Sequence, residues 1–99
     1  MTHPQLSSVV SQVQGSLEHA IDRLSGFLRI PAVSCDPAHA ADVRRLAEHI
    51  RDDLQKAGFD NARVLDVERR DGDAMAPHPC VAAEWLKAGA DKPTVHVFG

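Results

Sequence analysis

The chain has 99 residues, of which 43% are hydrophobic and 25% are charged. This composition is typical of a globular domain and excludes collagen-like, mucin-like and fully disordered chains. The 11 Lys and Arg against 14 Asp and Glu give a net charge of -3. They form no basic block, so no nucleic-acid partner is expected. Because chains near 100 residues bury only about 60–65% of their unfolded surface, at most one domain with a small core is predicted.

Neither a membrane span nor a secretory leader is indicated by the sequence. No apolar run approaches the roughly 20 residues that cross a bilayer, and residues 1–8 lack a basic and an apolar region. We therefore expect a cytoplasmic protein without a membrane partner. The two cysteines, Cys35 and Cys80, are too few for a disulfide framework and too far apart for a CxxC pair, so both are expected to be free thiols.

A long amphipathic helix is predicted over residues 6–28. Its apolar side chains fall within an arc of about 120° when residues are spaced at 100°. They are Leu6, Val9, Val10, Val13, Leu17, Ala20, Ile21, Leu24, Phe27 and Leu28. Gly15 and Gly26 weaken this helix, and Pro31 ends it by moving Ile30 out of the helical region.

A second helix is predicted to begin at Asp36 and Pro37, because the carboxylate can cap free amides and proline suits the first helical position. Gly58 follows its last apolar residue, where a left-handed cap is common. The apolar stripe consists of Ala40, Val43, Leu46, Ala47, Ile50, Leu54 and Ala57. The opposite face carries Arg44, Arg45, Glu48, Arg51, Asp52 and Asp53 and is interpreted as solvated.

After Gly58 the apolar period changes towards 2, which predicts strands. Residues 63–68 and 80–86 are expected to form a hairpin across the polar connection 69–79, and residues 94–98 a third strand after a turn at 88–93. The order is therefore helix, helix, strand, strand, strand, which indicates an α/β fold. Because ligands bind beyond the carboxyl ends of strands in such sheets, and the last strand is followed by Gly99, we expect the chain to be the leading part of a larger enzyme domain.

The residue chemistry predicts no catalytic or metal-binding site within the chain. The six histidines are His3, His19, His39, His49, His78 and His96. His19, His39 and His49 are expected to be exposed, and none of the six forms an HExxH pair. His78 and Cys80 supply only half of a tetrahedral zinc shell. His96 is expected to be a partly buried, hydrogen-bonded structural residue of its strand.

Two further groups have ordinary structural interpretations. Ser34 and Cys35 have no base at a recognisable spacing, so a loop in which Ser34 or Asp36 caps the next helix is expected. Four acidic residues gather near the turn of the hairpin but do not match a calcium-binding loop, and we interpret them as a solvated turn. They are Asp66, Glu68, Asp71 and Asp73.

Four segments, in order, resemble the di-zinc metallopeptidase family of carnosinase-type dipeptidases, aminoacylase, acetylornithine deacetylase and succinyl-diaminopimelate desuccinylase. They are FLRIPAVS at 27–34, DPAHAADVRRLAEHIRDDLQKAGF at 36–59, HPCVAAEWL at 78–86 and KPTVHVFG at 92–99. They cover nearly the whole chain, and the Glu84-Trp85 pair favours the dipeptidase branch. His96 departs from the pattern, since the family usually has an aliphatic residue there.

The resemblance implies that residues 1–99 form the start of a three-layer catalytic domain. In the family a His-x-Asp motif follows the residue matched by Gly99 and begins the binding of two zinc ions, so no metal ligand or catalytic residue is expected in this chain. Two metals can generate a hydroxide nucleophile and polarise an amide carbonyl. The parent protein is expected to be a dipeptidase or carboxypeptidase acting on small peptides or N-acyl amino acids, and to form homodimers through an inserted domain; the chain alone is expected to be inactive.

Two other hypotheses remain open. The chain could be a small non-catalytic α/β interaction module that presents the edge of its last strand to a partner. It could also be an independent metal-binding protein that uses His78 and Cys80, which predicts stoichiometric zinc.

Overall fold

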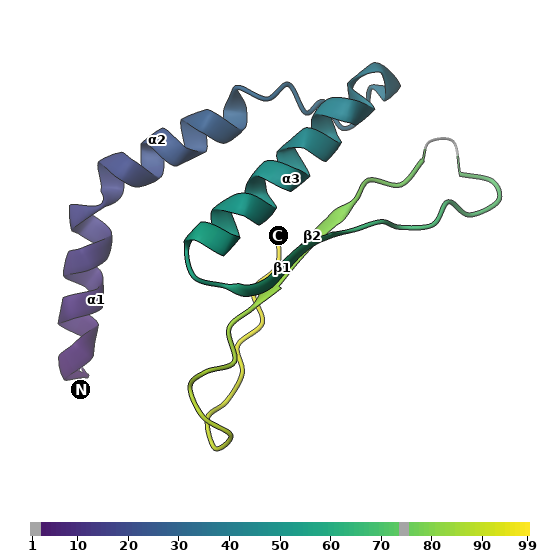
Figure 1. The fold of residues 1–99 in the computed structure, drawn as a ribbon. Coiled ribbons are helices and arrows are strands. Elements are labelled where there is room, and N and C mark those ends of the chain that lie inside the picture. The colour runs from purple at the N-terminus through teal and green to yellow at the C-terminus, as the bar shows by residue number, and fades with distance from the viewer. Residues whose placement is uncertain (1–2, 74–75) are drawn as a thin grey trace. The chain divides into compact units, whose positions relative to one another are not determined.

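The mixed helix and strand content expected from the sequence is present in the computed structural model, which describes residues 3–73 and 76–99. The elements run in the order α1 (Pro4–Gly15), α2 (Leu17–Leu28), the 3-10 turn η1 (Pro37–His39), α3 (Ala40–Lys56), β1 (Asp60–Leu65) and β2 (Cys80–Glu84) (Figure 1). The chain divides into two units, Met1–Leu46 and Ala47–Gly99. Helix α3 begins in the first unit and ends in the second.

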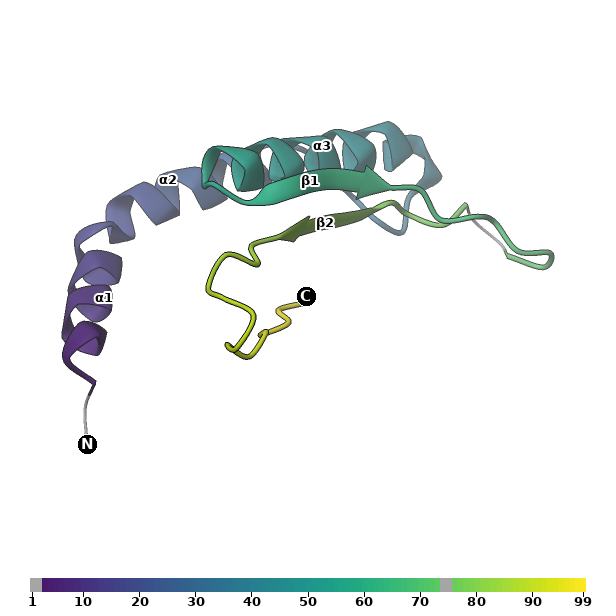
Figure 2. The same ribbon diagram turned by 60° about the horizontal axis from the view of Figure 1, so that its bottom comes forward.

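The single helix predicted over residues 6–28 is wrong, because the chain forms two helices that meet at Ser16 (Figure 2). Ser16 has φ −107° and ψ 12°, outside the helical range. Its hydroxyl donates to the carbonyl oxygen of Gln12 at 2.8 Å. The serine hydroxyl competes with backbone amides for the carbonyls of the preceding turn, and the neighbouring Gly15 restricts the backbone little. Together they end α1.

The predicted start of the second helix is confirmed. The Oδ1 atom of Asp36 accepts a hydrogen bond from the amide of Ala38 at 3.0 Å, and Pro37 occupies the first position. Asp36, and not Ser34, is therefore the cap. The first turn, η1, is a 3-10 turn, and regular α-helix begins at Ala40. Such tight turns are common at helix ends because they satisfy amides that lack partners one turn back.

The end of α3 is also as predicted. Gly58 has φ 100°, which an L side chain rarely adopts. The amide of Phe59 donates to the carbonyl of Leu54 at 3.1 Å, and the amide of Gly58 donates to that of Gln55 at 3.1 Å. This is the Schellman arrangement, in which the two residues after the helix satisfy carbonyls of its last turn. It turns the chain from α3 into β1.

The strand pairing predicted as a hairpin is confirmed, although both strand boundaries differ. β1 and β2 are antiparallel, with Leu65 opposite Cys80 and Asp60 opposite Glu84. β1 was expected at 63–68. It begins earlier because a bulge lets Asp60 and Asn61 join the strand pairing, although Asp and Asn are residues that usually favour turns. It ends earlier because the residue before Cys80 is Pro79, which has no amide hydrogen to extend the ladder.

β2 was expected to reach residue 86 but ends at Glu84. The reason is the partner strand: β1 begins at Asp60, opposite Glu84, so no residue of β1 lies opposite Trp85 or Leu86. Both side chains are more than half exposed. The bulge leaves Asn61 with φ 53°, a left-handed conformation that asparagine tolerates better than most residues.

The third strand predicted at 94–98 is wrong for the part of the chain that the structure describes. Those residues have no regular secondary structure. Val95, Val97 and Phe98 are 82%, 86% and 88% exposed. The turn before them at 88–93 is present, with φ 122° at Gly89 and a bond from the amide of Lys92 to its carbonyl. An alternating apolar sequence favours an extended chain, but a strand also needs a neighbouring backbone to pair with.

The second unit has a small apolar core. In both ribbon views the second half of α3 runs alongside the β1–β2 pair (Figures 1 and 2). Ala47 is buried, Ile50 and Leu54 follow it one and two turns later and are half-buried, and Val64 lies opposite Val81 in the sheet, both half-buried. The predicted apolar stripe is therefore covered from Val43 to Leu54, whereas Ala40 and Ala57 at its two ends are exposed.

The charged face of α3 is more covered than predicted. Arg44, Arg45 and Asp52 are exposed, whereas Glu48, Arg51 and Asp53 are half-buried. The guanidinium of Arg51 contacts the carboxylate of Asp52 at 3.0 Å. In contrast, the apolar residues that define the predicted stripe of α1 and α2 are largely exposed, with Val10 at 45% and Leu28 at 74%, and only Phe27 among them is half-buried.

Candidate functional site

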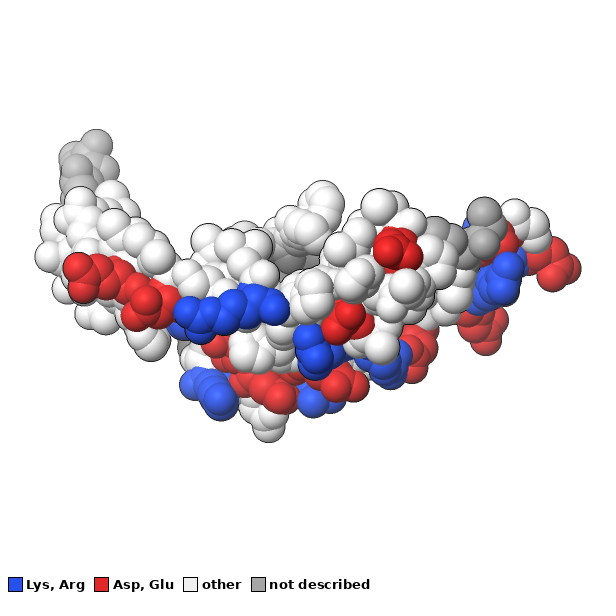
Figure 3. Space-filling view, turned by 90° about the horizontal axis from the view of Figure 1, so that it is seen from above, with Lys and Arg blue, Asp and Glu red and all other residues white. Residues whose placement is uncertain are grey.

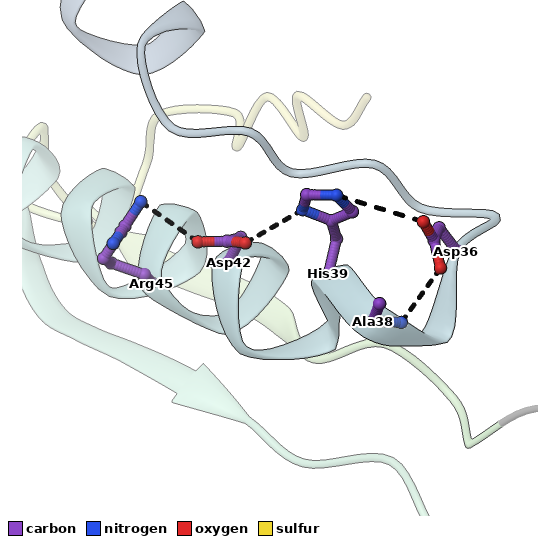
Figure 4. A network of polar contacts seen from close by, with 5 residues as sticks. All are labelled: Asp36, Ala38, His39, Asp42 and Arg45. Carbon is purple, nitrogen blue, oxygen red and sulfur yellow. Dashed lines mark hydrogen bonds and ion pairs between the residues drawn. The ribbon is translucent and has the colours of Figure 1, made fainter.

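A network of polar side chains lies at the start of α3 (Figure 4). Nδ1 of His39 is 3.0 Å from Oδ2 of Asp42, and Nε2 is 3.9 Å from Oδ2 of Asp36. The other oxygen of Asp42 is 3.1 Å from Nη2 of Arg45. The spacing i, i+3 along the chain places these side chains on one side of the helix.

This cluster is best explained as a device that fixes the helix start. Asp36 caps Ala38 with one oxygen and faces His39 with the other, and Asp42 joins His39 to Arg45. His39 was expected to be exposed. Its side chain is instead 34% exposed and held between two carboxylates. No group of three or more His, Cys, Asp or Glu side chains among the described residues could hold a metal ion.

A second polar set lies at the bulged end of the hairpin. Nδ2 of Asn61 donates to Oε1 of Glu84 at 3.2 Å, and Nη1 of Arg63 donates to the carbonyl of Asn61 at 2.8 Å. The ammonium of Lys87 is 3.2 Å from Oδ2 of Asp60. Sequence reasoning missed this set, because its members are brought together by the strand register. The bonds hold the bulge in place, and they leave no unpaired nucleophile or base in this set.

The acidic turn of the hairpin is largely solvated, as predicted, and one of its members, Asp73, also holds the turn. The amide of Arg70 donates to Oδ2 of Asp73 at 2.9 Å, and Nη2 of Arg69 donates to the carbonyl of Asp73 at 2.8 Å. Gly72 has φ 93° and allows the reversal. Asp66, Glu68 and Asp71 are exposed, and Asp73 is half-buried.

The remaining histidines and the cysteines have varied positions. His19 and His49 are exposed as expected, and His78 is half-buried. Both Cys35 and Cys80 are free and exposed, which confirms the thiol prediction. His96 was expected to be partly buried, but it is exposed, and its ring centroid lies 5.8 Å from that of Phe98 at 44°. The predicted burial of His96 was wrong because residues 94–98 do not pair with another strand.

His3 has a role that the sequence reasoning did not assign. Its Nδ1 accepts a hydrogen bond from the amide of Gln5 at 3.2 Å, and it thereby caps α1. Pro4 occupies the first helical position. The signal that could have found the cap is the His-Pro pair before the first apolar residue, since proline is common at the first position of a helix.

Charge and hydropathy add two observations about the surface. On the face drawn in Figure 3, Lys and Arg side chains are interspersed with Asp and Glu. No helix among residues 3–73 and 76–99 is both long and apolar enough to cross a membrane.

No family model matches the chain, and comparisons with curated proteins and with solved structures found no match either.

Proposed function

We propose that the chain forms the leading part of the catalytic domain of a zinc-dependent amide hydrolase of the dipeptidase or carboxypeptidase type. The observation that carries the proposal is the order of the four segments that resemble the di-zinc metallopeptidases. They are residues 27–34, 36–59, 78–86 and 92–99. They fall on consecutive parts of the fold: the end of α2 and its exit loop, η1 with α3 and its glycine cap, β2, and the last residues, which have no regular secondary structure.

Two structural features support this proposal. The DPAHAADV segment forms a capped helix start, and the AGF segment forms the Schellman turn that leads into β1. Residues 94–98 are exposed and have no regular secondary structure, and their sequence places Val95 and Val97 at alternate positions, as expected of a strand whose neighbours belong to a larger sheet. The resemblance further implies a small peptide or N-acyl amino acid as substrate and a homodimeric parent.

The described residues do not fit a zinc site, since they offer no group of three or more suitable ligands. The resemblance places the first zinc-binding histidine directly after Gly99. In this proposal residues 1–99 supply the scaffold that positions the site, and the chain alone is inactive.

The first test is the nucleotide sequence beyond the codon for Gly99. The proposal expects a frame that continues with His-x-Asp, and a longer protein that binds about two zinc ions and hydrolyses a dipeptide. Replacing the first histidine after Gly99 by alanine should remove both zinc and activity in the same protein. A frame without this motif, a longer protein that lacks activity when loaded with zinc, or hydrolysis by residues 1–99 alone would contradict the proposal.

A second candidate function is a non-catalytic interaction module that uses the edge of residues 94–98. The observation that favours it is the exposure of Val95, Val97 and Phe98, each above 80%. Exposed extended segments with free backbone groups can add to the sheet of a partner. This candidate requires that the chain unfold in one cooperative thermal transition, and broad non-cooperative melting would count against it.

A further inference from the structure

The turn in the connection between β1 and β2 contains an Asp-Gly pair, Asp71 and Gly72. An aspartate followed by glycine is prepared for ring closure, because the next backbone nitrogen can reach the side-chain carbonyl carbon to form a five-membered ring. Glycine has no Cβ that would crowd this nitrogen or restrict its approach. The pair is therefore a candidate site of covalent change, and neither candidate function makes use of it.

The structure leaves both reacting groups accessible. Asp71 and Gly72 are exposed, and a Cβ built at Gly72 meets nothing within 4 Å. Among residues 3–73 and 76–99, no group pairs with the carboxylate of Asp71, and no acceptor takes the amide hydrogen of Gly72. The residues on either side close the turn instead.

This closure consists of two hydrogen bonds between Arg70 and Asp73. The amide of Asp73 donates to the carbonyl of Arg70 at 3.2 Å, and the amide of Arg70 donates to Oδ2 of Asp73 at 2.9 Å. The turn is thus held from outside the Asp-Gly pair, and no bond of the turn has to break before the ring can close.

We propose that Asp71 isomerises to isoaspartate through a succinimide ring formed with Gly72. The amide nitrogen of Gly72 attacks Cγ of Asp71 and loses its proton, while a Cγ–O bond breaks and that oxygen leaves as water. A water molecule then opens the ring. Cleavage between Cγ and the nitrogen restores aspartate, whereas cleavage between the main-chain carbonyl carbon and the nitrogen leaves the chain running through Cβ and Cγ. One water is released and one is taken up, so the product is an isomer of the original chain.

Isomerisation changes the tip of the hairpin and leaves its ladder in place. It adds one carbon atom to the backbone between Arg70 and Asp73, so we expect both hydrogen bonds that join these residues to break. The strand pairing ends at Leu65 and Cys80, outside this turn, and its register should persist. This inference is independent of the hydrolase proposal and of the interaction module.

The first test is to keep the full chain in warm neutral buffer for several weeks and to locate isoaspartate by mass spectrometry. Cleavage after lysine releases residues 57–87, which also contain the exposed control Asp66, followed by Val67. Because a branched Cβ crowds the attacking nitrogen, isoaspartate should form at Asp71 at least about ten times faster than at Asp66. Equal rates at the two positions overturn the inference.

Substitutions test the ring chemistry. Asp71→Asn closes the same ring but releases ammonia, and a neutral amide is attacked more readily than an ionised carboxylate. Its mass should therefore rise from that of the amide to that of the acid during the incubation. Asp71→Glu needs a six-membered ring and should remain unchanged, and Gly72→Val should lower the rate at Asp71 to that at Asp66. An asparagine that persists at position 71, or a rate unaffected by Gly72→Val, rejects the mechanism.

A comparison with the chain unfolded in guanidinium chloride tests the contribution of the structure. Because an exposed turn opens at little cost, the rate at Asp71 in the folded chain should lie within about tenfold of the unfolded rate. Stronger protection contradicts the accessibility of the two groups. In the purified isomer, amide chemical shifts should change at Arg70 and Asp73 but not at Val64 and Val81 in the ladder, and changes throughout the ladder would refute a rearrangement confined to the turn.

Discussion

The glycine turn between α3 and β1 allows the energetic cost of a left-handed backbone conformation to be tested. Gly58 has φ 100°, and a Cβ added there would meet nothing within 4 Å. Steric crowding is therefore absent, and the cost of Gly58→Ala is that of the left-handed backbone itself. That cost is about 1–2 kcal/mol, and it is partly offset by the reduced freedom of alanine in the unfolded chain. We expect a net loss of about 1 kcal/mol in the free energy of unfolding.

The matched control is Gly15→Ala, the same chemical change at the last residue of α1. A Cβ at Gly15 also meets nothing within 4 Å, but its φ lies outside the left-handed range. Alanine is favoured there, and stability should rise by about 0.5–1 kcal/mol. The two substitutions thus differ in sign, although both add one methyl group in open space.

Unfolding in urea distinguishes the two sites. The chain has one tryptophan, Trp85, so its fluorescence reports on the unit that contains Gly58. Far-ultraviolet circular dichroism reports on the helices, including α1. Gly58→Asn should be less destabilising than Gly58→Ala, because asparagine tolerates the left-handed region. Equal stability of Gly58→Ala and the parent chain, or a larger loss with asparagine, would refute the conformational argument.

Two further substitutions test local roles. Asp36→Ala removes the acceptor for the amide of Ala38 and should cost about 1 kcal/mol of stability, seen as reduced helicity, whereas the exposed Asp52→Ala should change it by less than about 0.5 kcal/mol. Both Cys35 and Cys80 are exposed and should react completely with a thiol reagent in the folded chain, with Cys35→Ser and Cys80→Ser each losing one equivalent; a protected thiol would disagree with the structure.

The elements that the sequence predicted well are those set by local chemistry. Asp36 with Pro37 begins a helix because the cap and the fixed φ act within three residues. Gly58 ends it because few other residues adopt its backbone conformation. The hairpin between β1 and β2 followed from a change of period and from Gly72 between two apolar runs. For the two helix ends the information lies within one turn of the chain, and for the hairpin it lies within two neighbouring apolar runs and their connection.

The strand predictions that failed depend on partners elsewhere in the chain. The bulge at Asn61 and the end of β2 at Glu84 are set by the register between strands, which the sequence pattern does not encode locally. The segment centred on His96 has the composition of a strand but lacks a neighbouring backbone among the described residues. The absence of a catalytic or metal site was predicted because the required residue types do not occur at recognisable spacings. The interpretation that the chain is the leading part of an enzyme rests on the resemblance.

The break at Ser16 shows how small the difference between one helix and two can be. The apolar stripe runs through it in phase, which predicted one helix, but the serine hydroxyl competes for the carbonyl of Gln12 at 2.8 Å and for that of Val13 at 3.3 Å. Ser16→Ala removes this competition and adds a residue with about 0.5 kcal/mol better helix propensity.

Combined with Gly15→Ala, the change should total about 1–1.5 kcal/mol in favour of a continuous helix. Carbon chemical shifts of residues 14–18 should then move to helical values, and total helicity should rise. Ser11→Ala, another serine of α1 but away from the break, is the control and should leave the shifts at 16 unchanged. If the break persists in the double variant, the cause is not the serine hydroxyl or the glycine backbone but the packing around α2.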